Sequence, residues 1–333
     1  MSRVLLLRVD SPASTLAILP ALRVLRNAAP GTQIQLVCSA TSLCLFEHEP
    51  GVRATALPKN WKRMPRHELL HALGAEERED RYDAVVSLCL TASADIDALI
   101  DCIPTRARYS VSRASPLGDF PADVQPIEFS PDVREDESES VIRIVLQALG
   151  IALPVDAQKA LRAPALSPAD RAEAAEKMGD KHGLWLGICP LTSSRRLAGG
   201  QRRWRQILRS APTRLPAERV FLFGTPADYR VLEGLQASAP PAPPVDLCFP
   251  SSFRALAAYF ERTDAIVAVD TGPLELARAL GTPCMGILSR NTDTPSPARG
   301  GEVLVRPGLL GLPSRLGLEL ILRRWSPLPS GAD

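Results

Sequence analysis

Short apolar runs rich in β-branched residues alternate with longer helical stretches along most of the chain, and this alternation limits the possible folds more than any other feature. It is typical of a parallel sheet covered by helices, so it predicts an α/β fold. The predicted strands are Arg3–Val9, Gln33–Cys38, Ala54–Leu57, Ala84–Cys89, Arg106–Val111, Leu184–Cys189, Arg219–Phe223, Ala265–Val269 and Cys284–Leu288. The predicted helices are Thr15–Ala28, Arg66–Arg78, Ala94–Cys102, Glu137–Leu149, Pro168–Gly179, Trp204–Ala211, Ala227–Ala237, Phe253–Arg262 and Pro273–Leu280.

The alternation runs twice through the chain, and the stretch Ile151–Pro168, with its three prolines, separates the two series. A length of 333 residues also suits about two domains. We expect an N-terminal domain over residues 1–160 and a C-terminal domain over residues 161–312. Residues 313–333 would form a last helix and a tail that could pack back on the N-terminal domain. Ligands of doubly wound domains bind beyond the carboxyl ends of the strands and in clefts between domains.

Charge and cysteine content exclude several classes of protein. The 39 basic and 37 acidic residues give a net charge of +2, so no strong field indicates a nucleic-acid partner. No apolar run reaches the ~18–20 residues that cross a bilayer. The seven cysteines and four histidines show no metal-ligand spacing or disulfide pattern, and we expect a cytoplasmic protein without a metal site. Neither a dinucleotide-binding Gly-x-Gly-x-x-Gly nor a P-loop motif occurs.

The most informative motif joins the predicted strand Ala265–Val269 to the predicted helix Pro273–Leu280. The strand is followed by Asp270, Thr271 and Gly272, and proline occupies a favoured first helical position. Free backbone N–H groups and the positive end of the helix would then point at one spot, as in a diphosphate site. The alternative is that Asp270 or Thr271 only caps the helix.

This run, from Asp270 through Pro283, resembles the donor-binding signature of the bacterial heptosyltransferases, the lipopolysaccharide ADP-heptose transferases of glycosyltransferase family 9. Other segments resemble the family in the same order along the chain; they are Val4–Asp10, Leu19–Arg23, Pro30–Ile34, Glu49–Val52, Arg81–Val86, Gly187–Pro190, Arg203–Trp204 and Phe221–Asp228. The resemblance implies the GT-B architecture, in which two Rossmann-like, doubly wound domains face each other across the active cleft.

The resemblance also implies roles for side chains of the second domain. The Ser193 and Ser194 hydroxyls and the Arg195 guanidinium would contact the donor phosphates, and Asp228 would approach the nucleoside. Arg202 stands where the family has a phosphate-binding Lys and can act as a bidentate donor; equally, it could be a solvated cation at a helix start. The donor-binding residues implied in this way are Ser193, Ser194, Arg195, Arg202, Gly224, Asp228, Ser251 beside the base, Asp270, Thr271, Gly272 and Glu275.

Two catalytic positions depart from the family pattern. Ser14 occupies the position of the family's general base, an aspartate, and a hydroxyl cannot accept a proton near neutral pH as a carboxylate does. Asp10 lies near enough to replace it, and the alternative for Asp10 is a capping or salt-bridged carboxylate. Glu275 stands in place of a histidine, where it would repel a diphosphate unless a cation such as Arg278 neutralises it across one helical turn. The blander alternative is an exposed Glu–Arg pair.

A basic stretch over Lys59–His67 is the candidate acceptor site. Its cations suit phosphate or carboxylate groups, and Trp61 and Met64 could contact apolar chains at the membrane surface. The alternative is a solvated basic loop. The predicted acceptor-binding residues are Lys59, Lys62, Arg63, Arg66 and Arg113.

Together these features predict a glycosyltransferase that moves a heptose from an ADP-linked donor to an anionic glycan or glycolipid, such as lipopolysaccharide core, with inversion. No cofactor or metal is expected, and peripheral contact with the cytoplasmic face of the inner membrane is an expected feature. Two alternatives stay open. The chain could bind a nucleotide sugar without transferring it, because the usual base is absent, or it could use a different donor.

Overall fold

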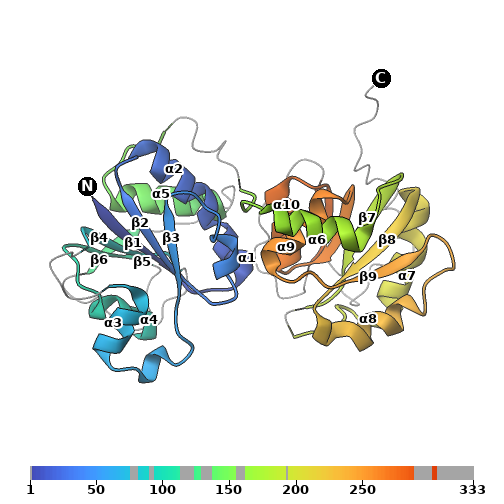
Figure 1. The fold of residues 1–333 in the computed structure, drawn as a ribbon, viewed down its shortest axis with the longest axis horizontal. Helices are drawn as coiled ribbons and strands as arrows, with labels where there is room; N and C mark the ends of the chain where they lie inside the picture. The colour runs from blue at the N-terminus through green and yellow to red at the C-terminus, as the bar shows by residue number, and fades with distance from the viewer. Residues whose placement is uncertain are drawn as a thin grey trace. The chain divides into compact units, whose positions relative to one another are not determined.

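The computed structural model describes residues 2–75, 82–89, 94–112, 124–128, 137–154, 162–192, 194–288 and 302–305. The chain divides into two compact units, Met1–Ala165 and Leu166–Asp333 (Figure 1). The expected last helix and tail over residues 313–333 lie outside the described residues, as do Arg113 and Ser193. No helix in the described part of the chain has both the length and the apolar character needed to cross a membrane.

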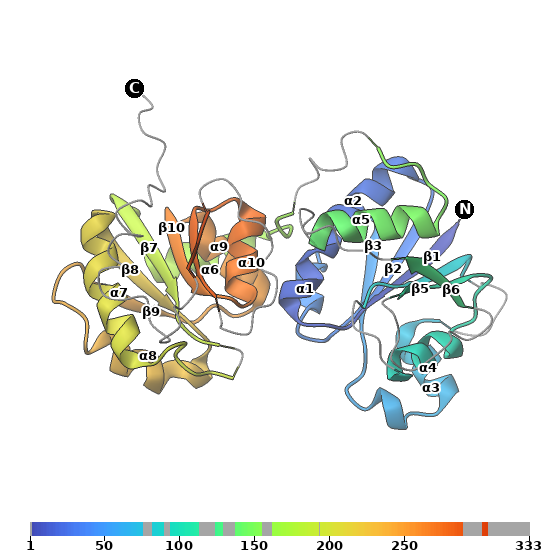
Figure 2. The same ribbon diagram turned by 180° about the vertical axis from the view of Figure 1, so that it is seen from behind.

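The first unit contains a six-stranded parallel sheet in the order β3-β2-β1-β4-β5-β6. Helices α2 and α5 cover one face, and α3 and α4 cover the other (Figures 1 and 2). The strands are β1 (Arg3–Arg8), β2 (Gln33–Cys38), β3 (Val52–Ala56), β4 (Ala84–Ser87), β5 (Arg108–Ser112) and β6 (Val124–Glu128). The helices are α1 (Pro12–Leu16), α2 (Ile18–Ala28), α3 (Arg66–Leu73), α4 (Ala94–Cys102) and α5 (Glu137–Ala148).

The second unit contains another six-stranded parallel sheet, in the order β12-β11-β10-β7-β8-β9. Helices α7 and α8 lie on one face, and α6, α9 and α10 on the other (Figures 1 and 2). The strands are β7 (Leu184–Cys189), β8 (Ala217–Phe223), β9 (Val245–Cys248), β10 (Ala265–Val269), β11 (Cys284–Ile287) and β12 (Glu302–Val305). The helices are α6 (Pro168–Met178), α7 (Gln201–Arg214), α8 (Tyr229–Gln236), α9 (Phe253–Glu261) and α10 (Gly272–Leu280).

Both sheets have the strand order of a Rossmann fold. In each sheet the first strand lies between the second and the fourth. The first three strands therefore extend the sheet towards one edge and the next three towards the other, and the switch point lies between β1 and β4 in the first unit and between β7 and β10 in the second. Ligands of such sheets bind outside the carboxyl ends of the strands at this switch point. The prediction of two doubly wound α/β units is therefore confirmed. In each unit, the topology indicates that a ligand site would lie at the carboxyl edge of the sheet, at the switch point.

Central strands and edge strands differ in how well the sequence indicates them. Strands β2, β7 and β10 have the predicted bounds, because buried strands of a parallel sheet are continuous apolar runs. Strands β6, β9 and β12 lie outside the predicted set, and all three are edge strands. Strand β6 even contains Pro126, which an edge strand tolerates because one side of it needs no ladder hydrogen bond.

The predicted helix Thr15–Ala28 is two helices. Helix α1 ends at Leu16 and α2 begins at Ile18, and Ser11 caps α1 by accepting a hydrogen bond from the Ser14 N–H. Pro20 then lies in the first turn of α2, where its missing N–H would have no intrahelical partner in any case. Asp10 and Ser11 lie in the short connection between the end of β1 at Arg8 and the start of α1 at Pro12, at the carboxyl end of the strand.

Candidate functional site

The start of helix α10 lies at the switch point of the second unit, directly after β10. Thr271 is the N-cap residue, but its side chain makes no capping hydrogen bond; the hydroxyl lies 3.3 Å from the Val269 carbonyl instead. The Asp270 N–H donates to Ile287 of the neighbouring strand at 3.1 Å. The Thr271 N–H donates to the Val269 carbonyl at 2.7 Å, so the Gly272 N–H and the positive end of the helix are what this uncapped start offers a phosphate at the carboxyl edge.

Glu275 and Arg278 form the ion pair that their spacing predicts. Arg278 Nη1 lies 2.5 Å from Glu275 Oε1, one helical turn away. The pair is not exposed as the blander alternative supposes, because the Arg278 side chain is 5% accessible and that of Glu275 is 34% accessible. The buried Arg278 guanidinium thus offsets the negative charge of Glu275. Both residues belong to the helix whose N-terminus is the candidate diphosphate site.

The loop after β7 folds back on itself through its hydroxyl groups. The Thr192 and Ser194 hydroxyls are 2.9 Å apart, and the Arg196 N–H lies 3.3 Å from the Thr192 hydroxyl. Arg195 has φ 58° and is the non-glycine residue with positive φ in the described part of the chain. Such a left-handed conformation costs energy and is common in ligand-binding loops. The loop contains the predicted residues Ser194 and Arg195, while Ser193 lies outside the described residues.

Asp228 follows β8 and uses its two carboxylate oxygens differently. Oδ2 accepts hydrogen bonds from the Thr225 N–H at 2.8 Å and the Thr225 hydroxyl at 2.6 Å, so it closes the turn that begins at Gly224. Oδ1 is buried without a hydrogen-bond partner, and Arg195 Nε is 3.9 Å away. A Cβ at Gly224 would lie 2.6 Å from Leu232 Cδ1, so a larger residue here would displace the Leu232 side chain. The unsatisfied Oδ1 is available to accept a hydrogen bond from a ligand hydroxyl.

Ser251 and Arg202 are both exposed in the second unit. The Ser251 N–H donates to Glu173 Oε1 at 2.9 Å, and its hydroxyl bonds the same carboxylate. Arg202 lies in the first turn of α7 and faces solvent, which fits the alternative of a solvated helix-start cation. Its neighbour Arg203 is buried instead. Sequence reasoning assigned Arg203 no role, and only its position one residue before the buried Trp204 could have indicated its burial.

Asp10 lies at the switch point of the first unit, where Arg8 holds it. Arg8 Nε is 2.8 Å from Asp10 Oδ2, with side-chain exposures of 1% and 29%. Arg8 also donates to the Leu88 carbonyl at 2.5 Å, beyond the end of β4, and pairs with Glu137 of α5. Asp10 is therefore a salt-bridged carboxylate, as the alternative to a base role supposes. Its side chain is nevertheless partly exposed, so a ligand could contact it. Sequence reasoning gave Arg8 no role. The feature that could have indicated one is a basic residue at the end of an otherwise apolar strand.

Ser14 lies in the first turn of α1, next to the cap. Its hydroxyl is 3.3 Å from that of Ser11, and no carboxylate occupies its position. Cys89 lies past the end of β4, and burial raises the pKa of its thiol to about 11, with the Asp10 charge also raising it. The thiol is therefore protonated at neutral pH, so Asp10 rather than Cys89 is the candidate base at this edge.

The basic stretch forms a short turn, Trp61–Arg63, followed by helix α3. Lys62 pairs with Asp95, and Arg66 Nε donates to the Cys102 carbonyl at 3.3 Å. Trp61 and Met64 pack against the hydrophobic core beneath α3 and α4. Both side chains remain partly exposed, so the expectation that they contact apolar chains at a membrane surface stays a prediction. Lys59, Lys62, Arg63 and Arg66 are exposed, while Arg113 lies outside the described residues.

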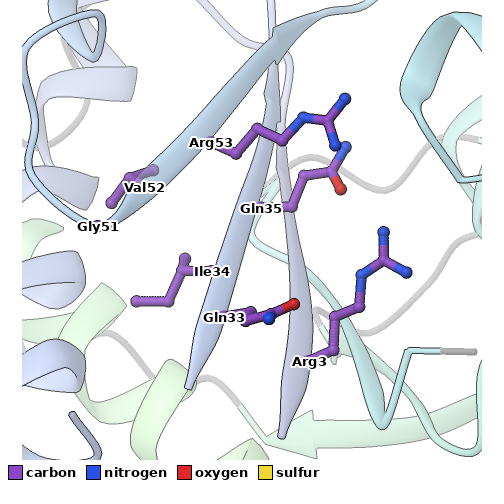
Figure 3. Close-up of a pocket in the computed structure, with 7 residues that line it drawn as sticks. All are labelled: Arg3, Gln33, Ile34, Gln35, Gly51, Val52 and Arg53. Atoms are coloured by element: carbon purple, nitrogen blue, oxygen red, sulfur yellow. The ribbon is translucent and has the colours of Figure 1, made fainter. Parts of the chain in front are cut away.

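A cavity of about 390 Å³ lies elsewhere in the first unit, near the starts of strands β1, β2 and β3 (Figure 3). The side chains of Arg3, Gln35 and Arg53 extend to the same side of these strands. Parallel strands place their starts opposite their carboxyl ends, so this cavity is separate from the switch point that carries Asp10. The lining residues are Arg3, Gln33, Ile34, Gln35, Gly51, Val52 and Arg53. Within the described residues, no group of histidine, cysteine and acidic side chains could hold a metal ion.

Comparisons with known proteins agree with this fold. The model of glycosyltransferase family 9 (heptosyltransferase) matches residues 71–298. The structure of Escherichia coli heptosyltransferase WaaC with ADP-2-deoxy-2-fluoro heptose has 18% identity and a TM-score of 0.68, covering 96% of this chain and 98% of WaaC.

Two further solved structures are similar over most of their length. A family 9 glycosyl transferase from Veillonella parvula DSM 2008 has 16% identity and a TM-score of 0.73, covering 92% of this chain and 87% of its own. E. coli ADP-heptose lps heptosyltransferase II has 16% identity and a TM-score of 0.70, covering 97% and 98%. No curated protein sequence matches the chain. At these identities the likeness to solved structures concerns the fold.

Proposed function

Because the chain belongs to glycosyltransferase family 9, we propose that it transfers a heptose from an ADP-linked donor to an anionic glycan or glycolipid, such as lipopolysaccharide core, with inversion. The observation that carries this proposal is the start of α10 at the switch point of the second unit, which no side chain caps and where Gly272 is the first helical residue. Two solved structures of the similar protein WaaC contain ADP or an ADP-linked sugar, which supports the choice of nucleotide.

The second unit would bind the donor. The Gly272 N–H and the positive end of the α10 dipole, with the Thr271 hydroxyl, would stabilise the diphosphate as negative charge develops on the leaving group. Arg202 and Arg195 would add charge-assisted hydrogen bonds. Asp228 Oδ1, buried and without a hydrogen-bond partner, would accept one from a hydroxyl of the nucleoside.

The first unit would bind and activate the acceptor. Asp10 would accept the proton of the attacking hydroxyl, and Arg8 would keep the carboxylate in one place. The exposed cations Lys59, Lys62 and Arg63 would attract the anionic acceptor. No cofactor or metal takes part in this scheme.

A second candidate function is nucleotide-sugar binding without transfer. Two observations favour it: Ser14 provides no carboxylate at the family's base position, and Glu275 places negative charge in the first turn of α10. A transferase with a different donor would also accommodate Glu275. The two candidates differ in activity rather than in nucleotide binding.

The test measures binding and transfer separately. ADP should raise the thermal midpoint more than UDP or GDP at equal concentration, because a ligand that binds only the native state stabilises it by mass action. Equal shifts with all three nucleotides, or none, would contradict the ADP assignment. Transfer or hydrolysis of ADP-heptose, compared with UDP- and GDP-sugars, then decides between an enzyme and a binding protein.

A further inference from the structure

Among the residues that the structure describes, Arg203 is a buried cation with no counter-charge. It is 5% exposed, and its Nε and Nη2 atoms are enclosed with no hydrogen-bond partner. The other buried arginines of the described chain are paired: Arg8 with Asp10 and Glu137, Arg254 with Asp170 at 2.9 Å, and Arg278 with Glu275. Arg203 therefore differs from every other arginine that this fold encloses within the described ranges.

An unpaired buried guanidinium disfavours the folded state. Burial lowers the pKa of Arg203, but an arginine side chain stays protonated in proteins. Its charge is therefore withdrawn from water without compensation, a situation in which removal of the charge is often stabilising. Charged residues that a fold encloses without a partner are frequent at ligand sites, where the ligand supplies the missing charge.

The surroundings of Arg203 are those of an anion site. The side chain lies in the first turn of α7, against Gly199, where an added Cβ would be 2.9 Å from both its Cδ and its Nη1. Gly199 and Gly200 have φ 73° and 82°, so the loop over the guanidinium adopts a conformation that favours glycine. Gly200 is the N-cap of α7 and provides no side chain to accept the first N–H groups. These N–H groups and the guanidinium therefore occupy the same end of the helix.

The position in the sheet also fits a ligand. The loop before α7 follows β7, which pairs with β10 at the switch point of the second unit. It thus leaves the same carboxyl edge as Thr271 and Gly272. Arg202, the neighbour that the family resemblance indicates, is exposed and can approach a ligand from solvent, whereas Arg203 is fixed beneath the loop.

We propose that Arg203 is the buried counter-charge of an anion that binds at the N-terminus of α7, and that this anion is the diphosphate of the donor. The second half of this statement rests on the proposed function. The positive charge enclosed in this place would attract the diphosphate at short range in a medium of low dielectric constant, and its prior burial would remove the entropy cost of ordering the side chain.

The test uses Arg203→Met, which keeps length and apolar volume but removes the charge. We expect the unfolding midpoint of the ligand-free protein to stay the same or rise, and the affinity for inorganic pyrophosphate and for ADP to fall at least tenfold by calorimetry. The matched control is Arg205→Met, an exposed arginine on the same helix, which should change neither quantity. If Arg203→Met does not fold, Arg203→Gln should fold and still weaken pyrophosphate binding, because the amide carries no charge.

The outcomes separate this inference from the proposed function. Loss of pyrophosphate binding in Arg203→Met, or its weakening in Arg203→Gln, supports the buried counter-charge. Unchanged binding in the variant tested, or no pyrophosphate binding by the wild-type protein, overturns it. If the wild-type protein binds ADP no more tightly than pyrophosphate while the Arg203 variant loses both, the anion site stands and the nucleotide assignment fails.

Discussion

The Nε atom of Arg8 lies 2.8 Å from Oδ2 of Asp10, and the same guanidinium reaches the Leu88 carbonyl and Glu137. A single buried cation thus connects the ends of β1 and β4 to the start of α5. Because three partners on different elements hold Arg8, the Asp10 carboxylate is fixed at the carboxyl edge of the first sheet. This is the arrangement that positioning a catalytic base requires.

We expect Asp10→Asn to lower the rate of sugar transfer by ~10²–10⁴-fold, because the amide cannot accept the acceptor's proton. ADP affinity should not change, since the donor residues belong to the second unit. Ser14→Asp, which restores the family's carboxylate, should raise the activity. Steady-state kinetics with calorimetric ADP titration would check both variants, and unaltered transfer by Asp10→Asn would exclude this residue as the base.

Neutralising Lys62, Arg63 and Arg66 together should raise KM for the anionic acceptor and leave the ADP-induced thermal shift unchanged. Little stability should be lost, since the pair of Lys62 with Asp95 is exposed and such pairs contribute about 0–1 kcal/mol. Kinetics at several acceptor concentrations would measure the effect. A weaker thermal shift with ADP would mean instead that the basic stretch serves the donor or the fold.

Glu275→Gln should have opposite effects on stability and on binding. Arg278 loses the carboxylate at 2.5 Å, and because Glu275 is about one-third exposed we expect a loss of only about 1 kcal/mol. ADP affinity should rise severalfold, because a negative charge leaves the first turn of α10. Glu261→Gln, which removes an exposed pair with Arg171, is the matched control for denaturation and titration. Reduced ADP affinity would show that Glu275 makes a favourable contact with the donor.

The pair of Asp170 and Arg254 should make stability depend on acid pH. Burial alone would raise the pKa of Asp170, but hydrogen bonds from Arg254 and from the Ser167 hydroxyl and N–H, with the Arg254 charge, outweigh it and lower the pKa. The folded state then binds fewer protons than the unfolded chain, so this stabilisation is present above the ordinary aspartate pKa of about 4 and is lost as the pH falls further.

Asp170→Asn should therefore cost about 3 kcal/mol at pH 7, and much less near pH 2, when measured by denaturant unfolding. The exposed Glu176 pairs with Lys177 on the same helix, so Glu176→Gln controls for a change of net charge and should track the wild type at every pH. Parallel curves for the wild type and Asp170→Asn would contradict the role of the pair.

The sequence by itself indicated the central strands, the two doubly wound units and the local contacts. Helix α4 and strands β2, β7 and β10 have the predicted bounds. The pair of Glu275 and Arg278 was also predictable, because residues three apart share a helix face. Features of this kind depend on the spacing of residues that are close in the sequence, so a short segment is enough to predict them.

Only the tertiary structure decided which charges are buried and what each one meets. Asp170 and Arg254 are 84 residues apart, and Arg8 and Glu137 are 129 apart, so no local pattern indicates either contact. Arg202 and Arg203 are adjacent and chemically identical, yet one is exposed and the other enclosed. The orientation of α7 about its own axis decides which of the two side chains faces the interior and which faces solvent. Burial of a charge is a property of the packed elements, because the dielectric around it depends on what packs there.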